Sequence, residues 1–365
     1  MINKRLAILG IRGIPARYGG FETFAEEISV RLVKRGGDVT VFCDTTDAGK
    51  SEYKGVKLRY VRSFKLGPLT TIIHDLRCIL DALNGYDIIY MLGYGAGPFF
   101  WIPRLFKRPI WVNMDGLEWK RSKWPWYGRL YLKISEWFAV KFASLLIADA
   151  EGIKDYLTSK YGKAINCHTI PYGAEVVVIP PDSHLIKNFE LEPFEYYLVV
   201  CRLEPENHVK EIIEGFQASD TNKKLIIVGD HRTNTAYSKE ILKTDDSRIR
   251  FIGTIFDKEL LKAVRYYSFA YFHGHCVGGT NPSLLEALSC GNIVVAHDNV
   301  FNREVAGEVG LYFRSSDEIP TLVEAVESMD ESEKSDLSIK AREQIRNNYA
   351  WEIVVDMYQK ILKIR

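Results

Sequence analysis

The sequence has no run of apolar residues long enough to cross a membrane. A spanning helix needs about 20 consecutive apolar residues. The apolar stretch after Lys4 and Arg5 is interrupted by Arg12, too early for a signal peptide. The six cysteines are widely spaced without a Cys-x-x-Cys pair, and no Asp-x-Asp motif is present. We therefore expect a cytoplasmic protein with free thiols, with no disulfide framework and no bound metal.

The chain as a whole has no large excess of charge of one sign, but each half of the sequence does. Lys plus Arg is 48 and Asp plus Glu is 47, which gives a net charge of +1. Residues 1–175 carry 26 basic and 17 acidic residues, whereas residues 176–365 carry 22 basic and 30 acidic ones. Two parts of opposite charge suggest two domains, the first of which binds something anionic. Mutual attraction between the two domains is the alternative.

The hydrophobic pattern predicts an α/β fold for the first part. The whole chain has 365 residues, which is enough for about two domains. The chain begins as strand, glycine loop, helix and strand, at residues 5–9, 10–20, 21–35 and 39–43. A β-α-β start predicts a parallel, doubly wound sheet. Further strands are expected at residues 87–91, 109–112 and 145–148.

A second series of alternating strands and helices begins near Tyr196. Strands are expected at residues 197–201, 224–228, 250–252, 269–272 and 293–296, with a helix at 209–218. We therefore predict a first Rossmann-like lobe at residues 1–178, a linker at 179–193 and a second lobe at 194–348. The last segment, 349–365, is expected to be a helix that packs back on the first lobe.

The glycine loop between Gly10 and Gly20 does not have the spacing of a dinucleotide site. The sequence G-I-R-G, followed later by Gly19 and Gly20, is not G-x-G-x-x-G. These glycines would still let a substrate approach the backbone N–H groups at the start of a helix. A purely structural tight turn is the alternative.

The most informative stretch is residues 271–291, Y-F-H-G-H-C-V-G-G-T-N-P-S-L-L-E-A-L-S-C-G. Asn281 is a good N-cap and Pro282 a good first helical residue. A Gly-Gly-Thr turn before such a helix favours an anion such as a diphosphate. Glu286 lies one turn inside the helix, where its carboxylate could accept two hydrogen bonds from a ribose diol. A solvated surface glutamate is the alternative.

Arg202 follows directly after a predicted strand. Its guanidinium would lie at the carboxyl edge of the second sheet, where open α/β folds bind ligands. Arginine suits bidentate binding of phosphate oxygens. A structural ion pair with Glu204 or Glu206 is the alternative.

Together these residues give the chain a family resemblance. It resembles family 4 of the retaining glycosyltransferases. Four motifs carry this resemblance: Y-G-G-F-E (18–22), T-I-P-Y-G (169–173), C-R-L-E-P-E (201–206) and P-S-L-L-E-A-L-S-C-G (282–291). The segments V-N-M-D-G-L-E-W (112–119) and H-G-H-C-V-G-G-T-N-P (273–282) are similar to a subgroup containing bacterial rhamnosyltransferases of surface-polysaccharide (capsule) synthesis. The resemblance implies a GT-B fold, with two Rossmann-like lobes that face each other across a cleft.

The resemblance also implies roles for particular residues. Arg202 would neutralise the diphosphate of a nucleotide sugar, Glu286 would hold its ribose, and Gly19 and Gly20 would shape the facing wall of the first lobe. The implied donor-binding residues are Gly19, Gly20, Arg202, Asn207, His273, His275, Gly278, Gly279, Thr280, Asn281, Pro282, Ser283 and Glu286.

Three positions need separate comment. Gly278 stands where the family usually has a glutamate, and Asn207 stands where it usually has a lysine. Asp115 falls about where the family often has a histidine near the transferred sugar. We assign Asp115 and Arg202 as the catalytic candidates. Asp115 would serve as a base or as a sugar-orienting acid, with a structural cap at the Asp115-Gly116 turn as the alternative.

The stretch Trp119 to Lys133, W-K-R-S-K-W-P-W-Y-G-R-L-Y-L-K, interleaves basic and aromatic residues and contains no acid. This composition is typical of contact with a bilayer interface or a pyrophosphate-linked lipid. The candidate acceptor or membrane residues are Trp119, Lys120, Arg121, Lys123, Trp124 and Trp126. Partly buried tryptophans with solvated lysines are the alternative, and no nucleic-acid module is recognisable.

These observations predict a retaining, metal-independent glycosyltransferase without a cofactor. We expect it to use a nucleotide sugar, dTDP-rhamnose, and a lipid-linked saccharide acceptor, at the inner face of the plasma membrane. A sugar-nucleotide epimerase of the same fold and a catalytically weak sugar-nucleotide binder are the alternatives.

Overall fold

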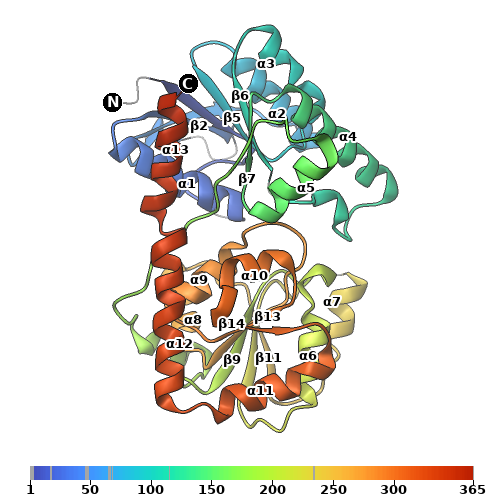
Figure 1. The fold of residues 1–365 in the computed structure, drawn as a ribbon, viewed down its shortest axis with the longest axis vertical. Helices are drawn as coiled ribbons and strands as arrows, with labels where there is room; N and C mark the ends of the chain where they lie inside the picture. The colour runs from blue at the N-terminus through green and yellow to red at the C-terminus, as the bar shows by residue number, and fades with distance from the viewer. Residues whose placement is uncertain are drawn as a thin grey trace. The chain divides into compact units, whose positions relative to one another are not determined.

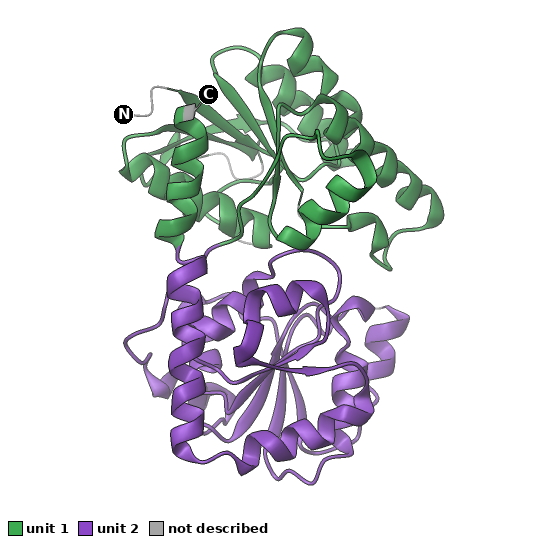
Figure 2. Cartoon of the chain, in the orientation of Figure 1, with its two compact units in different colours: residues 1–172, 351–365 green, residues 173–350 purple. Residues whose placement is uncertain are grey.

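The chain forms two compact units in a computed structural model (Figure 2). The structure describes residues 4–16, 19–45, 49–64, 67, 69–114, 116–232 and 235–364. Unit 1 comprises residues 1–172 together with 351–365, and unit 2 comprises residues 173–350. Each unit is built on a mainly parallel sheet with helices, so the predicted two-lobed α/β fold is confirmed.

In the described part of unit 1, eight strands form one sheet in the order β3-β4-β2-β1-β5-β6-β7-β8 (Figure 1). Its neighbouring strands run parallel except for the antiparallel pair β3–β4. The strands are β1 (Arg5–Leu9), β2 (Asp38–Asp44), β3 (Glu52–Tyr53), β4 (Val56–Val61), β5 (Ile88–Leu92), β6 (Ile110–Met114), β7 (Leu145–Ala148) and β8 (Cys167–Thr169). Every residue of β5, β6 and β7 is buried, as expected for parallel strands covered on both faces.

The helices of unit 1 come from both ends of the chain. They are α1 (Gly20–Lys34), α2 (Leu69–Ala82), α3 (Trp101–Leu105), α4 (Trp126–Phe142), α5 (Glu151–Tyr161) and α13 (Trp351–Ile364). The last of these, α13, lies beside α1 (Figure 1). Phe24 of α1 packs against the rings of Trp351 and Tyr358, and the Tyr358 hydroxyl lies 2.6 Å from that of Tyr90 on β5.

In the described part of unit 2, six parallel strands form a sheet in the order β11-β10-β9-β12-β13-β14. They are β9 (Tyr196–Val200), β10 (Lys224–Val228), β11 (Ile249–Gly253), β12 (Ala270–His273), β13 (Val294–His297) and β14 (Gly310–Phe313). The helices are α6 (Val209–Gln217), α7 (Ala236–Ile241), α8 (Lys258–Tyr266), α9 (Pro282–Cys290), α10 (Val300–Ala306), α11 (Ile319–Ser328) and α12 (Glu331–Gln344).

The strand order of unit 2 reverses direction between β9 and β12. The chain leaves β9 toward β10 on one side, and it leaves β12 toward β13 on the other. Such a switch point opens a crevice at the carboxyl ends of the two strands, where open α/β sheets bind their ligands. The loops after β9 and β12 carry most of the residues that the sequence singled out.

The stretch expected to link the two lobes, residues 179–193, lies within unit 2. It forms the short helix η4 (Ser183–Phe189), whose Ile186 is fully buried. Tyr267 at the end of α8 donates a hydrogen bond to the carbonyl of Pro181, 2.6 Å away. None of the helices that the structure describes is both long enough and hydrophobic enough to cross a membrane.

Candidate functional site

The N-terminus of α9 lies at the switch point of unit 2. The Asn281 side chain caps the helix by accepting a hydrogen bond from the Ser283 N–H at 2.9 Å, and Pro282 is the first helical residue. This cap confirms the prediction. Gly278 before it has a φ of 123°, which favours glycine over any residue with a side chain. The preceding turn therefore presents its backbone beside the positive end of the helix dipole.

Ser283 ties this helix to the neighbouring strand. Its hydroxyl donates to the carbonyl of Val200 at the end of β9, 3.0 Å away, and lies 2.6 Å from the hydroxyl of Tyr271. Arg265 on α8 donates to the same Ser283 oxygen at 3.2 Å. The side chain of Ser283 is thus used inside the fold, where it fixes the start of α9 against β9.

Glu286 is held by a buried cation. Its carboxylate lies 2.6 Å from the Arg265 guanidinium; the Arg265 side chain is 6% exposed, whereas that of Glu286 is 42% exposed. The pair leaves the glutamate accessible but fixes its direction. An oriented, accessible carboxylate one turn into α9 is suited to accept hydrogen bonds from a diol.

Arg202 extends from the end of β9 into solvent. Its side chain is 52% exposed, and its guanidinium lies 3.6 Å from the Glu204 carboxylate. This is a loose ion pair at an accessible site, and such pairs contribute little stability. The guanidinium can therefore turn to a phosphate at small cost.

Asn207 connects the loop after β9 to the loop after β12. Its amide donates to the backbone carbonyl of Arg202 at 2.7 Å, and its carbonyl oxygen lies 2.8 Å from Nδ1 of His275. Asn207 is only 5% exposed. Asn207 thus positions Arg202 and His275.

The backbone of His275 is fixed from the other side. Asn299 and Asn302 donate their amides to the His275 carbonyl at 3.0 Å and 2.9 Å. A Cβ on the adjacent Gly274 would lie 1.9 Å from the backbone carbonyl oxygen of Asn207, so only glycine permits this approach of the two loops. The imidazole of His275 is held between β9 and β12 by contacts at both its ring and its backbone.

Two further histidine contacts surround this loop. His273 is buried, and burial holds its pKa well below the ordinary value, so its imidazole is neutral. His208 bonds the Gly274 carbonyl through Nδ1 at 2.7 Å and stacks on His297, with ring centroids 4.0 Å apart. Burial and the neighbouring His208 lower the pKa of His297 as well.

The structure thus brings most of the predicted donor-binding residues to one edge of unit 2. They are Arg202, Asn207, His273, His275, Gly278, Gly279, Thr280, Asn281, Pro282, Ser283 and Glu286. Gly19 and Gly20 lie in unit 1, at the start of α1. Asp115 lies outside the described residues.

Sequence reasoning missed the residues that hold this site in place. Arg265 lies 21 positions before its partner Glu286 on another helix, and nothing in the sequence connects the two. Asn299 did carry a signal, because it follows an apolar strand and caps α10 by accepting from two backbone N–H groups.

The basic and aromatic stretch of unit 1 is largely tied to two acids that flank it. Glu118 accepts from the Trp124 indole at 3.0 Å and pairs with Lys123 and Arg121 at 2.7 Å and 3.3 Å. Burial tends to raise the pKa of Glu118, but Arg121 and Lys123 lower it by more. Arg121 is only 9% exposed, so it faces the fold rather than a partner.

Trp119 is held in the same way. Its indole donates to Glu136 at 3.0 Å, and the ammonium of Lys133 lies 4.6 Å from its ring centroid. Lys120 is exposed and lies over the same ring. Of the six residues predicted to contact acceptor or membrane, Trp126 is by contrast 76% exposed.

Comparisons with known proteins agree with this geometry. Residues 184–350 match the family model of glycosyl transferases group 1, and residues 3–175 match a domain of unknown function, DUF1972. No curated protein sequence matches the chain.

Solved structures match over the whole length. Sucrose-phosphate synthase from Thermosynechococcus elongatus has a TM-score of 0.80 at 18% identity, with 100% of both chains covered. Anabaena HepE in complex with UDP and glucose has a TM-score of 0.80 at 17% identity, also with 100% of both chains covered. An α,α-trehalose-phosphate synthase (UDP-forming) from Burkholderia xenovorans has a TM-score of 0.71 at 15% identity, with 98% of this chain and 100% of that chain covered. Residues 184–350 of the second unit are therefore similar to glycosyl transferases group 1, and the chain has the two-lobed GT-B fold.

Proposed function

We propose that this protein transfers a sugar, with retention, from a nucleoside-diphosphate sugar to a lipid-linked glycan. The observation that carries the proposal is the grouping at the switch point of unit 2. Arg202 at the end of β9, the turn at residues 278–281 before α9 and the oriented Glu286 lie on one sheet edge. They offer a cation, backbone donors and a carboxylate, which match a phosphate pair and a ribose.

The chemistry follows from where charge develops. Breaking the bond between the anomeric carbon and the diphosphate leaves negative charge on the leaving group. Donors fixed beforehand lower this barrier because they do not reorganise during the reaction. Arg202 and the backbone of the turn at residues 278–281, beside the positive end of α9, supply such donors without a metal. His275, directed by Asn207, is a further polar group of the same edge.

The donor we propose is dTDP-rhamnose, on the sequence similarity to surface-polysaccharide rhamnosyltransferases. HepE was solved with UDP-glucose, so UDP-glucose is the natural comparison in a donor screen. The acceptor would be a saccharide on a lipid carrier at an anionic membrane surface, to which the enzyme binds peripherally. A net positive unit 1 is consistent with this acceptor.

A donor panel tests the proposal. The full chain is incubated with dTDP-rhamnose, UDP-glucose and other nucleotide sugars, with and without a bacterial membrane lipid extract and with a chelator. We expect released nucleoside diphosphate and a labelled lipid product only when both substrates are present, with the donor's anomeric configuration kept in the product. Conversion of the donor without acceptor would indicate an epimerase instead. Nucleotide binding without turnover would indicate a binding protein.

The variant Arg202→Ala tests the diphosphate assignment. Loss of one preorganised charge donor costs roughly 100-fold in kcat. Arg232→Ala, an accessible arginine in the loop after β10, is the matched control and should keep activity. Unchanged turnover in Arg202→Ala would contradict the role given to Arg202.

A further inference from the structure

One face of α4 is apolar and turned to solvent. Trp126, Leu130, Ile134 and Trp137 follow one another at spacings of four, four and three residues, which places them on the same side of the helix. Their exposed fractions are 76%, 52%, 43% and 44%. The opposite side of α4, with Leu132 and Ala139, packs into unit 1. A helix with an apolar stripe on each side is unusual for a protein surface.

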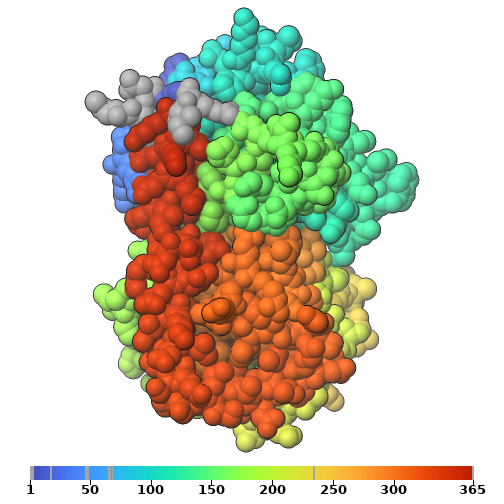
Figure 3. Space-filling view, viewed as in Figure 1, coloured from blue at the N-terminus to red at the C-terminus, as the bar shows by residue number. Residues whose placement is uncertain are grey.

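The neighbouring helix α3 carries further exposed apolar residues. Leu105 and Phe106, at its C-terminal end, are 69% and 58% exposed, and α3 packs against α4. Both helices lie at the periphery of unit 1 (Figure 1 and Figure 3). We call Leu105, Phe106 and the four α4 residues, with the basic side chains among them, the α3–α4 surface.

The charge on this surface is of one sign. Exposed basic side chains accompany the apolar ones, and they are Arg104, Lys107, Arg129, Lys133 and Lys141. In the described residues 101–109 and 126–142 the only acid is Glu136, which is 1% exposed and accepts hydrogen bonds from Trp119, Tyr156, Lys160 and Tyr161. A second copy of the same cationic face would be repelled.

We infer that the α3–α4 surface is the part of unit 1 that inserts into an anionic bilayer. Tryptophan, leucine and isoleucine side chains enter the boundary between headgroups and acyl chains, while flanking lysines and arginines meet anionic lipid headgroups. The surface shares its residues 126–133 with the stretch Trp119 to Lys133 that composition singled out. It leaves out residues 119–124, because Glu118 and Glu136 bind much of that part. The inference deepens the membrane partner of the proposed function, but it is tested without donor or acceptor.

Vesicle sedimentation of the full chain is the first test. Binding to phosphatidylcholine vesicles that contain phosphatidylglycerol should exceed binding to phosphatidylcholine alone and should fall with salt. The double variant Trp126→Ser with Trp137→Ser should lower the partition coefficient about tenfold or more, since each buried aromatic contributes strongly. Phe256→Ser, at a 73% exposed site in unit 2, is the matched control.

A second variant separates the two candidate surfaces. Lys120→Ser with Lys123→Ser should weaken vesicle binding less than the tryptophan pair, because Lys123 is occupied by Glu118. If the lysine pair abolished binding and the tryptophan pair did not, the inference would be overturned. Self-association of the wild-type chain that the tryptophan pair removes, without vesicle binding, would also overturn it.

Quenching by brominated lipids tests insertion without relying on a disruptive substitution. Tryptophan fluorescence of the wild type should fall on binding to anionic vesicles that carry bromine in the upper acyl chain. Trp126→Phe with Trp137→Phe keeps the apolar face and should remove most of the quenching while the chain still sediments with vesicles. Absence of quenching in the bound wild type would exclude insertion. Because no sugar nucleotide is present, failure here leaves the transferase proposal untouched.

Discussion

Glu286 makes an ion pair with the buried Arg265, and this contact fixes the direction of its carboxylate. Replacing Glu286 by glutamine keeps the shape but removes the charge that accepts hydrogen bonds from a diol. Hydrogen bonds to charged groups contribute about 1.5–3 kcal/mol, so we expect the KM for the nucleotide sugar to rise by about 10-fold or more. Steady-state kinetics with Glu343→Gln, an exposed site on α12, as control checks this. An unchanged KM would remove Glu286 from the ribose site.

Asp75 on α2 is a buried carboxyl, and its burial raises the pKa from 3.8 to about 7. The unfolded chain releases this proton at lower pH than the folded chain does. The contribution of Asp75 to the free energy of unfolding therefore falls as the pH rises from about 4 to about 7. Asp75→Asn should stabilise unit 1 at pH 8, by on the order of 3 kcal/mol, and have little effect near pH 4. Urea unfolding at both pH values measures the difference, and an equal effect at both would contradict the assignment.

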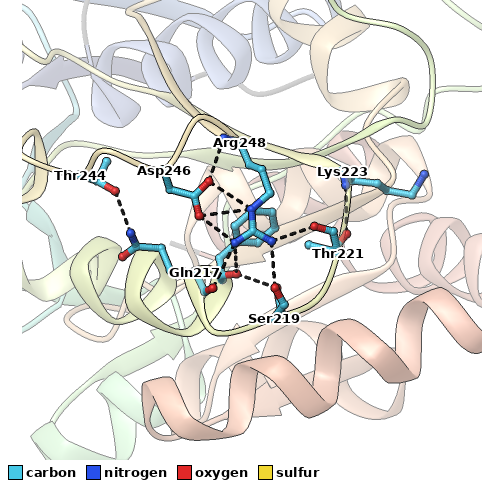
Figure 4. A network of polar contacts seen from close by, with 8 residues as sticks. Gln217, Ser219, Thr221, Lys223, Thr244, Asp246 and Arg248 are labelled. Atoms are coloured by element: carbon cyan, nitrogen blue, oxygen red, sulfur yellow. Dashed lines mark hydrogen bonds and ion pairs between the residues drawn. The ribbon is translucent and has the colours of Figure 1, made fainter.

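Arg248 closes the end of α6 with a single side chain (Figure 4). Its guanidinium donates to the carbonyls of Ser219 and Thr221, each at 2.8 Å, and to that of Gln217 at 3.1 Å. Asp246 pairs with it at 2.7 Å, and this hydrogen bond holds the pKa of Asp246 below its ordinary value. The last carbonyls of a helix need partners of this kind.

Arg248→Ala should therefore destabilise unit 2 by about 2–3 kcal/mol, since it leaves several carbonyls without their donor. Hydrogen exchange of α6 and β11 reports the loss directly. Arg232→Ala, in a loop of the same unit, serves as the control. If exchange in α6 stayed unchanged, the carbonyl contacts would be replaceable by water.

At the scale of the element, Glu136 joins three segments of unit 1. It lies on α4 and accepts from Trp119 before α4 and from Tyr156, Lys160 and Tyr161 of α5, with its Lys160 contact at 2.7 Å. Breaking a buried ion pair by removing one partner costs about 3–5 kcal/mol. Glu136→Gln should therefore lower the urea midpoint of unit 1 and speed hydrogen exchange in α5. Glu151→Gln, at a largely exposed side chain, should do neither.

Strands with a run of apolar residues could be predicted from the sequence, whereas short or half-exposed strands were missed. The strands at residues 5–9, 145–148 and 224–228 each contain four consecutive apolar residues, preceded in two of them by Arg5 and Lys224, and the structure gives the same bounds. β4 and β14 were missed. β4 alternates buried and exposed residues, and β14 has only four residues, three of them half-buried. The cap at Asn281 was predictable because capping is local.

The arrangement of side chains around the site depended on contacts distant in sequence. The Arg265–Glu286 pair and the Asn207–His275 bond join residues on different loops and helices. A window over residues 119–133 shows basic residues without acids, yet two acids lie just outside it. Glu118 pairs with Lys123 of the window, and Glu136 accepts from its Trp119. Trp126 belongs both to the residues that composition singled out and to the α3–α4 surface, whereas the apolar residues of α3 lie outside the compositional window.

On the scale of the whole molecule, tryptophan fluorescence reports on unit 1 alone. All seven lie in unit 1, at positions 101, 111, 119, 124, 126, 137 and 351. Tyr358→Phe removes the hydroxyl that contacts Tyr90 and should lower the stability of unit 1 by about 1 kcal/mol. The tryptophan fluorescence transition should shift accordingly. Exchange protection of the β9 and β12 amides in unit 2 should stay as in the wild type, and a matching loss there would contradict separate units.

The return of the last helix has a consequence for biosynthesis. Unit 1 is built from residues 1–172 and from α13, whose Tyr358 and Trp351 pack on Phe24. Domains generally fold in the order in which the ribosome releases them. Here the unit that is translated first is completed last, after all of unit 2 has emerged. A chain that is released before α13 has been translated would therefore expose the apolar residues of unit 1, such as Phe24, against which α13 packs.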